Sequence, residues 1–159
     1  MAGKICFWCF KARGNHAVCP HCGYEPGSDS GQAYQLSPGT ILQKRYVIGA
    51  SIGFGGFGIT YIGRDLRLDM KIAIKEYYPS GYANRNVSVS PDITISNKRQ
   101  EAFIEDGKRK FLNEARVLAQ FNDEPGIVDV RDFFEENSTA YIIMEYLEGQ
   151  DIRSYLKQE

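Results

Sequence analysis

The sequence lacks a large excess of charge, a long hydrophobic run and any cysteine beyond its first 22 residues. Its 19 Lys and Arg residues nearly balance 20 Asp and Glu residues, so the formal net charge of -1 gives no bulk attraction to nucleic acid or to anionic membranes. No apolar stretch approaches the length of a membrane span, and residues 1–13 contain no extended apolar core followed by a small-residue cleavage site. We therefore expect a cytoplasmic protein without a membrane segment, in which cysteines stay reduced.

The cysteines form two closely spaced pairs near the N-terminus. Two residues separate the members of each pair, which are Cys6 with Cys9 and Cys19 with Cys22. Each pair places two thiolates on one turn, and two facing turns complete a tetrahedral four-sulfur site of the kind that holds Zn2+. The alternatives are two disulfides or free buried thiols. His16 and His21 are competing ligands that a complete four-sulfur site does not need.

The cysteine segment, residues 1–24, resembles bacterial zinc ribbons. The resemblance implies a structural or partner-binding module, because four sulfurs leave no open coordination position for catalysis. Phe7, Trp8 and Phe10 either cover its small core or form a binding face with three nearby Lys and Arg residues. Three cations are few for binding driven by counterion release, so we expect a protein partner rather than nucleic acid. Residues 25–38 begin with a turn-rich, apolar-poor run and predict a linker.

A six-residue segment that contains four glycines indicates a phosphate-binding turn. Residues 53–58 are Gly-Phe-Gly-Gly-Phe-Gly, and Lys75 follows seventeen residues after the last glycine. Because β-branched and aromatic residues continue directly at 59–62, the turn joins two strands. A dinucleotide-binding fingerprint would need a helix there, and a Walker pattern would need Lys-Ser or Lys-Thr. The pattern therefore predicts a clamp for nucleotide phosphates, whereas a plain hairpin turn and a solvated strand lysine are the simpler alternatives.

The segments after the linker predict an α+β domain over residues 39–159. The expected strands are 46–48, 59–62, 71–75, 127–134 and 139–146. An amphipathic helix over residues 100–121, which Gly107 breaks or kinks, lies between the third and fourth strands. Residues 84–98 predict either an inserted hairpin or a mobile loop. The strands of that hairpin would be residues 86–90 and 93–96.

These motifs, in this order, resemble the N-terminal lobe of a protein kinase, most closely the Ser/Thr kinases of eukaryotic type found in bacteria. The resemblance implies a five-stranded antiparallel sheet with one main helix. It implies that Lys75 contacts the α- and β-phosphates of ATP and pairs with Glu114, for which Glu101 and Glu105 are the competitors. The implied nucleotide contacts are Ile52, Gly53, Gly55, Gly56, Phe57, Gly58, Thr60, Ala73, Lys75, Met144, Glu145, Leu147 and Asp151. Of these, Met144 would be the gatekeeper, Glu145 and Leu147 the adenine-binding hinge, and Asp151 the ribose contact.

The motifs of the catalytic half of such a domain do not occur in the sequence. Neither H-R-D nor D-F-G follows Leu147, and Asp132-Phe133 precedes the hinge. The resemblance therefore implies a truncated kinase domain without its C-lobe. We expect the ATP-binding part of a Ser/Thr kinase that acts on protein substrates, with the Mg2+ ligands missing and no phosphoryl transfer by this chain alone. The alternative is a non-catalytic module, a zinc ribbon joined to a pseudokinase lobe that binds a protein or nucleic-acid partner.

Overall fold

A computed structural model describes residues 4–28, 32–56, 58–150 and 152–157. Within these residues, six strands form one antiparallel sheet in the order β1-β2-β3-β4-β8-β7. Their bounds are β1 Ile41–Leu42, β2 Tyr46–Gly55, β3 Gly58–Asp65, β4 Met70–Tyr77, β7 Val130–Glu136 and β8 Thr139–Glu145. The five predicted strands are all present, and the two-residue strand β1 extends the sheet at one edge. No described helix is both long and apolar enough to cross a membrane.

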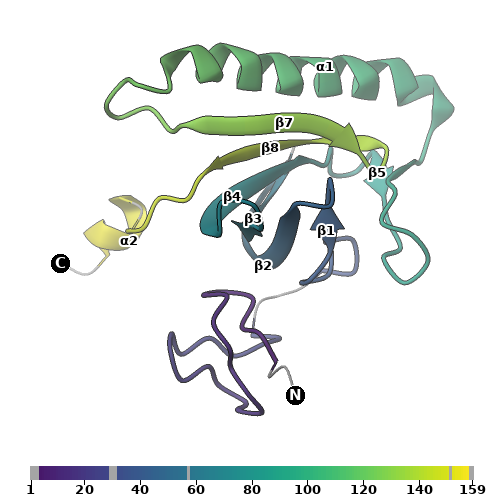
Figure 1. The fold of residues 1–159 in the computed structure, drawn as a ribbon. Helices are drawn as coiled ribbons and strands as arrows, with labels where there is room; N and C mark the ends of the chain where they lie inside the picture. The colour runs from purple at the N-terminus through teal and green to yellow at the C-terminus, as the bar shows by residue number, and fades with distance from the viewer. Residues whose placement is uncertain (1–3, 29–31, 57, 151, 158–159) are drawn as a thin grey trace.

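Helix α1, Glu101–Leu118, covers one face of the sheet and lies along β7 and β8 (Figure 1). Its buried residues Ile104, Phe111 and Ala115 recur at helical spacing, as the amphipathic pattern predicts. Two short 3-10 turns, Lys98–Gln100 and Ala119–Phe121, flank α1 and account for the longer predicted range of 100–121. A short helix α2, Ile152–Leu156, lies near the C-terminus.

Gly107 does not interrupt α1, although the sequence suggested a break or a kink there. A Cβ atom at this position would lie 2.1 Å from Tyr77 Oη. Tyr77 is buried in β4 and its hydroxyl donates to the carbonyl of Ile104 at 3.3 Å. The glycine therefore lets the helix approach the sheet closely, and burial of the helix outweighs the weak helix preference of glycine.

The sheet has an apolar core on each face, because alternate residues of each strand point to opposite sides. On the α1 side, Ala140 and Ile142 pack with Phe111 of the helix. On the other side, Ile72 and Ile74 pack with Tyr141 and Ile143. Segments outside the sheet cover this second core, with Leu36, Ala83 and Ile93 buried against it. Both faces are thus covered over the middle of the sheet, where most residues of β3, β4 and β8 are buried.

The inserted segment forms a smaller hairpin than the sequence predicted. Strands β5, Ala83–Asn84, and β6, Thr94–Ile95, pair in the registers Ala83↔Ile95 and Asn84↔Thr94. The prediction of a first strand over residues 86–90 was wrong. The carbonyl of Asn86 accepts hydrogen bonds from the N–H groups of Val89 and Ser90. The Asn86 side chain accepts another from Ser88 N at 3.1 Å. An Asn side chain that bonds to the backbone two residues later favours a turn over an extended strand.

The cysteine-containing segment packs below the sheet, where Figure 1 draws it in purple. It touches the outer edge of β2: Ala50 N donates to the carbonyl oxygen of Phe7 at 3.0 Å. Gly49 allows this contact, because a Cβ atom there would lie 2.3 Å from that oxygen and 2.9 Å from the ring of Phe10. Trp8 instead stacks on Tyr24 within the segment, with ring centroids 5.6 Å apart. The aromatic residues therefore divide between the segment's own core and the contact with β2.

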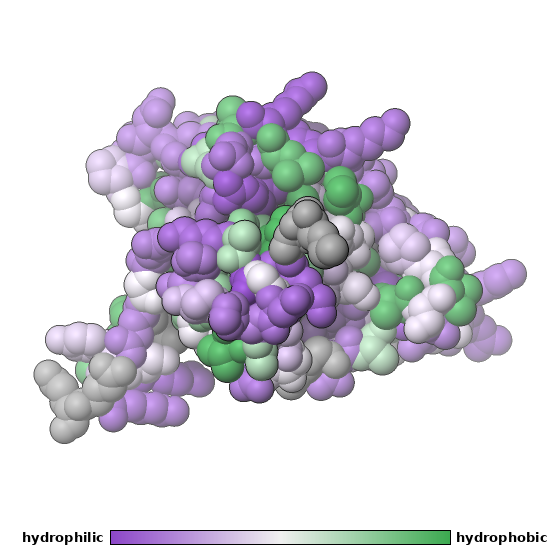
Figure 2. Space-filling model, turned by 60° about the horizontal axis from the view of Figure 1, so that its bottom comes forward, coloured by the Kyte–Doolittle hydropathy of each residue, from purple (hydrophilic) through white to green (hydrophobic). Residues whose placement is uncertain are grey.

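Figure 2 shows one face of the molecule in which hydrophobic residues form separate patches among hydrophilic ones. Phe54, Leu147 and Phe103 are among the large apolar side chains that stay at least half exposed. Phe54 and Phe103 lie beside a cavity that also borders β4 and α1.

Candidate functional site

A cavity of about 690 Å3 opens between the glycine-rich turn (residues 53–58), strand β4 and helix α1. Its described lining residues are Gly53, Phe54, Gly55, Gly58, Thr60, Lys75, Tyr77, Phe103, Asp106, Gly107, Lys110, Phe111 and Glu114. The sequence predicted six of these as functional: Gly53, Gly55, Gly58, Thr60, Lys75 and Glu114. Residues that are distant in the sequence thus meet around one space large enough for a small ligand.

Lys75 enters the cavity from the middle of β4. Its register opposite Thr60 of β3 and Ile142 of β8 fixes it on the face that carries α1. The side chain is half-buried, and Nζ lies 5.7 Å from the ring centroid of Phe111. An aliphatic stem held by packing and a cationic tip in an open cavity suit the binding of an anion such as a phosphate.

Glu114 lines the same cavity from α1, but it is exposed. Among the described ion pairs none joins Lys75 to Glu114, so the expected pair is not formed in this arrangement. The competitor Glu105 instead pairs with Lys108 at 3.0 Å. Of the three candidate glutamates, Glu114 alone lines the cavity with Lys75.

The glycine-rich turn connects β2 and β3, as the sequence predicted. Gly55 pairs with Gly58 and Gly53 with Thr60, after two irregularities in the β2–β3 register. A Cβ at Gly58 would lie 2.9 Å from the carbonyl oxygen of Glu76, whereas one at Gly55 would meet no atom within 4 Å. Gly58 is therefore required by close packing, and the tip of the turn is open to a ligand. Phe57 lies outside the described residues.

The predicted hinge residues continue from the cavity along β8 and beyond it. Ala73 pairs with Met144, and Ile72 pairs with Glu145, so the hinge follows directly from the strand next to Lys75. The Glu145 carboxylate accepts from Asp129 N at 2.8 Å, and Glu145 N donates to the Asp129 carbonyl at 3.0 Å. Leu147 and Ile52 are exposed. Neither they nor Ala73, Met144 and Glu145 line the cavity itself. The predicted ribose contact, Asp151, is outside the described residues.

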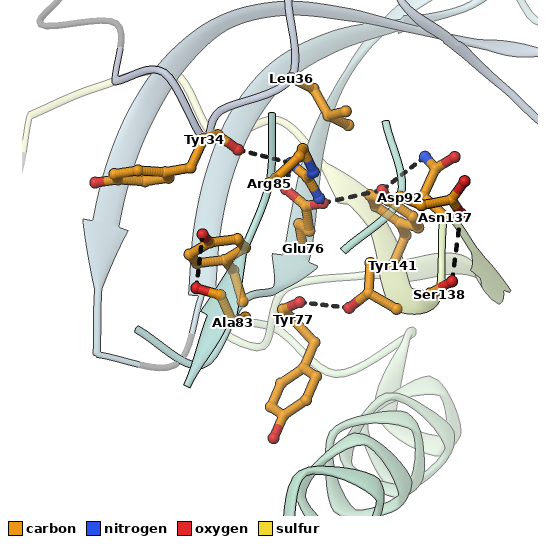
Figure 3. A network of polar contacts seen from close by, with 12 residues as sticks. Tyr34, Leu36, Glu76, Tyr77, Ala83, Arg85, Asp92, Asn137, Ser138 and Tyr141 are labelled. Atoms are coloured by element: carbon orange, nitrogen blue, oxygen red, sulfur yellow. Dashed lines mark hydrogen bonds and ion pairs between the residues drawn. The ribbon is translucent and has the colours of Figure 1, made fainter. Parts of the chain in front are cut away.

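A buried polar network lies on the opposite face of β4, beside Lys75 (Figure 3). Glu76 is fully buried and forms an ion pair with Arg85 of the inserted segment. Two tyrosines of neighbouring strands also donate to this carboxylate, Tyr61 at 2.8 Å and Tyr141 at 2.9 Å. A buried charge needs such partners, since an unpaired one is costly. Burial raises the pKa of both tyrosines, so their hydroxyls remain donors.

Sequence reasoning missed this network, although one signal was available. Glu76 is two residues beyond Ile74 and four beyond Ile72, so period two assigns it to the same buried face. A glutamate at such a position requires a cation nearby. That this cation is Arg85 depends on the turn that follows β4, so residue spacing could not predict it.

The four cysteines form a compact cluster, with all four sulfur atoms within 4.8 Å of one another. The Cys6 and Cys22 sulfurs are 3.7 Å apart, as are those of Cys9 and Cys19. All four thiols are free, so the disulfide alternative is wrong. A zinc ion with sulfur ligands at about 2.3 Å in a tetrahedron requires sulfur pairs about 3.8 Å apart, and the cluster fits it. His21 contacts the carbonyl of Ala12 at 3.1 Å.

The cluster also favours the thiolate form at one ligand. Burial raises the pKa of Cys19, but hydrogen bonds from the backbone N–H groups of His21 and Cys22 and from the Cys22 and Cys6 side chains together lower it to about 6. Burial raises the pKa of Cys9 and of Cys22, so without a metal ion these two sulfurs favour the thiol form. Thiolate, not thiol, is the metal-binding form of cysteine. The donor set and its geometry therefore both suit a closed four-sulfur metal site.

Comparison with known proteins gives the same assignment for most of the chain. The sequence model of the family described as "Protein kinase domain" matches residues 46–159. The chain is 32% identical over 118 residues to serine/threonine-protein kinase PrkC of Bacillus subtilis, covering 74% of this chain and 15% of PrkC. It is 32% identical over 130 residues to serine/threonine-protein kinase PknA of Mycobacterium tuberculosis, covering 77% of this chain and 25% of PknA.

A solved structure titled "PpkA-294 apo form" superposes with a TM-score of 0.73 at 36% identity. The match covers 79% of this chain and 43% of that one. The chain thus spans less than half of each of these three proteins. The described residues form the sheet and main helix of an N-lobe and contain no helical C-lobe.

Proposed function

Because the chain belongs to the protein kinase family, we propose that its sheet and main helix bind ATP for a Ser/Thr protein kinase. The observation that carries the proposal is the shared cavity, in which Lys75 from β4 and the backbone of the glycine-rich turn face Glu114 of α1. Backbone N–H groups of the turn and one lysine are the donors that bind nucleotide phosphates in this family. The Ser/Thr kinases PrkC and PknA, to which the chain is similar, support this substrate class.

Most of the predicted site residues that the structure describes take a defined role in this proposal. Gly53, Gly55 and Gly58 bring the backbone close to the phosphates, and Lys75 neutralises the α- and β-phosphates. The adenine would lie between the exposed Ile52 and the strand that carries Ala73, next to the hinge. The adenine-side residues are Ile52, Thr60, Ala73, Met144, Glu145 and Leu147. Glu145 would offer its carbonyl, since its N–H and carboxylate already contact Asp129.

The four cysteines would hold a zinc ion with a structural role. When bound, Zn2+ crosslinks the two turns that carry Cys6 with Cys9 and Cys19 with Cys22. Such a short segment has little apolar core, so metal binding would supply much of its folding free energy. We propose that this module binds a protein partner, and its packing on β2 supports a link with the nucleotide-binding lobe.

These 159 residues would bind ATP without transferring its γ-phosphate. The family holds Mg2+ with a D-F-G Asp and a catalytic-loop Asn, and it accepts the substrate proton with an H-R-D Asp. The sequence contains neither motif after the hinge. The unformed Lys75–Glu114 pair favours the second candidate, a non-catalytic binding module, because active kinases require this ion pair. If the chain phosphorylated a Ser/Thr substrate and Lys75→Met abolished this activity, both the proposed lack of phosphoryl transfer and the non-catalytic alternative would be contradicted.

Calorimetric titration of MgATP tests the ATP-binding proposal. We expect weak saturable binding that Lys75→Met reduces at least about tenfold, because a charge-assisted hydrogen bond to phosphate is worth about 1.5–3 kcal/mol. Lys108→Met is the control: it also removes one positive charge, but Lys108 pairs with Glu105 at 3.0 Å and does not line the cavity. No binding, or equal loss in both variants, would contradict the proposed site.

A further inference from the structure

The glycine-rich turn is exposed at the end of the β2–β3 hairpin, where Ser80 N donates to the carbonyl of Gly56 at 3.0 Å. Ile52 and Phe54 are 39% and 50% exposed, and Gly53, Gly55 and Gly56 are exposed as well. Phe54 is the one large side chain among the described residues of the turn, and it lines the cavity with Lys75. Whatever holds Phe54 therefore influences the position of the backbone that would cover the phosphates.

Tyr34 contacts the Phe54 ring from outside the turn. Its ring centroid lies 5.4 Å from that of Phe54, at an interplanar angle of 42°. Tyr34 also stacks on Tyr78, with ring centroids 5.1 Å apart and an interplanar angle of 16°. Tyr34 precedes the residues that match the kinase domain, 46–159, so this contact comes from the segment that joins the cysteine module to the sheet.

The backbone around Tyr34 is fastened to the sheet by the buried network (Figure 3). The carbonyl of Tyr34 accepts from Arg85 Nη1 at 2.9 Å, and Arg85 is held in turn by Glu76. Two residues later, Leu36 N donates to Tyr61 Oη at 3.0 Å. Leu36 itself is only 3% exposed. The ring of Tyr34 is therefore presented from a fixed backbone and not from a loose connection.

We propose that Tyr34 is a positioning residue for the glycine-rich turn, acting through its ring contact with Phe54. The chain of contacts runs from buried Glu76, through Arg85 and the Tyr34 backbone, to Phe54 at the edge of the cavity. A turn supported in this way loses less conformational freedom when a ligand orders it. The consequence for nucleotide affinity rests on the proposed function, whereas the effect on the turn itself does not.

Amide hydrogen exchange and MgATP titration of variants at Tyr34 and Phe54 test this inference. Tyr34→Ala removes the ring, and Tyr34→Phe keeps it; both keep the carbonyl that Arg85 binds. We expect Tyr34→Ala to speed exchange at residues 53–56 and to weaken MgATP binding by about 2- to 12-fold, the range that corresponds to a lost aromatic pair. Tyr34→Phe should restore both readouts to wild-type values, and exchange in α1 should stay unchanged throughout.

Phe54→Ala keeps the test decisive if Tyr34→Ala does not fold, because it removes the same contact from a half-exposed position. It should speed exchange in the turn as well, and the double variant should add nothing. Unchanged exchange at residues 53–56 in either single variant overturns the inference. If exchange responds but the wild-type chain binds no MgATP, the ATP-binding proposal fails while the role of Tyr34 in holding the turn stands.

Discussion

At the scale of single residues, Glu76 and Arg85 form the one ion pair among the described residues in which both side chains are fully buried. We expect Arg85→Met to lower the free energy of unfolding by about 3–5 kcal/mol, since it leaves a buried carboxylate without its cation. Urea denaturation measures the loss. Adding Glu76→Gln should recover part of it. The control Arg64→Met removes an exposed pair with Asp69 and should cost less than about 1 kcal/mol. Equal losses in both arginine variants would contradict this reasoning.

Residue identities could be predicted where chemistry fixes the spacing. The glycines, Lys75 and the four cysteines are recognisable because a phosphate or a metal ion demands those groups at those intervals. Glu114 could be selected from helical periodicity, but the absence of its pair with Lys75 could not, because that depends on how α1 sits against the sheet. Arg85 and Tyr34 escaped prediction for a related reason: their partners are set by turns and by packing, not by a repeating interval.

At the scale of elements, the turn between β3 and β4 depends on one carboxylate. Asp65 is 1% exposed and accepts from Arg45 at 3.0 and 2.7 Å and from the backbone N–H groups of Arg67 and Leu68. The hydrogen bonds from Arg45 are the main cause of a pKa for Asp65 below its usual 3.8. Because the pKa of Asp65 is lower in the folded state than in the unfolded state, its ionised form stabilises the fold. This contribution to the free energy of unfolding is fully present above the unfolded-state pKa. It is lost as the pH falls through the folded-state pKa.

We expect the free energy of unfolding to fall more steeply with decreasing pH in the wild-type chain than in Asp65→Asn. Urea denaturation from pH 6 down to about pH 2 measures the two curves, and the sign follows from the linkage of proton binding to unfolding. The variant should be less stable at pH 6 and should approach the wild type at the acid end. Parallel curves would show that Asp65 does not titrate differently in the folded state.

Element types were more predictable than their ends. The strands and α1 carry clear periodicities over many residues, so the sequence identified them. The 86–90 strand was wrong because its alternating pattern competes with the turn that Asn86 initiates, and Gly107 was misjudged because its role depends on Tyr77 of another element. Local preference predicts an element well only where no neighbour demands a specific close approach.

At the scale of the whole molecule, the cysteine module should depend on metal while the sheet should not. We expect one zinc per chain after purification without added zinc, measured by elemental analysis. Removal of the metal with a chelator should collapse the amide signals of residues 4–24, whose folding depends on it. The sheet should stay folded, because it has its own apolar core on both faces. Cys9→Ser should reproduce the chelator's effect. A folded, metal-free module under reducing conditions would refute the metal site.

The most direct test of the central claim is to locate bound nucleotide on the chain. MgATP is titrated into the isotope-labelled 159-residue protein while backbone amide signals are followed by NMR. We expect shifts at Gly53, Gly55 and Gly58, at Lys75, and at Met144 to Leu147, and we expect these shifts to disappear or to become much weaker in Lys75→Met. Shifts confined to residues 4–24, or shifts that persist unchanged in Lys75→Met, would contradict the assignment of this cavity and hinge as an ATP site.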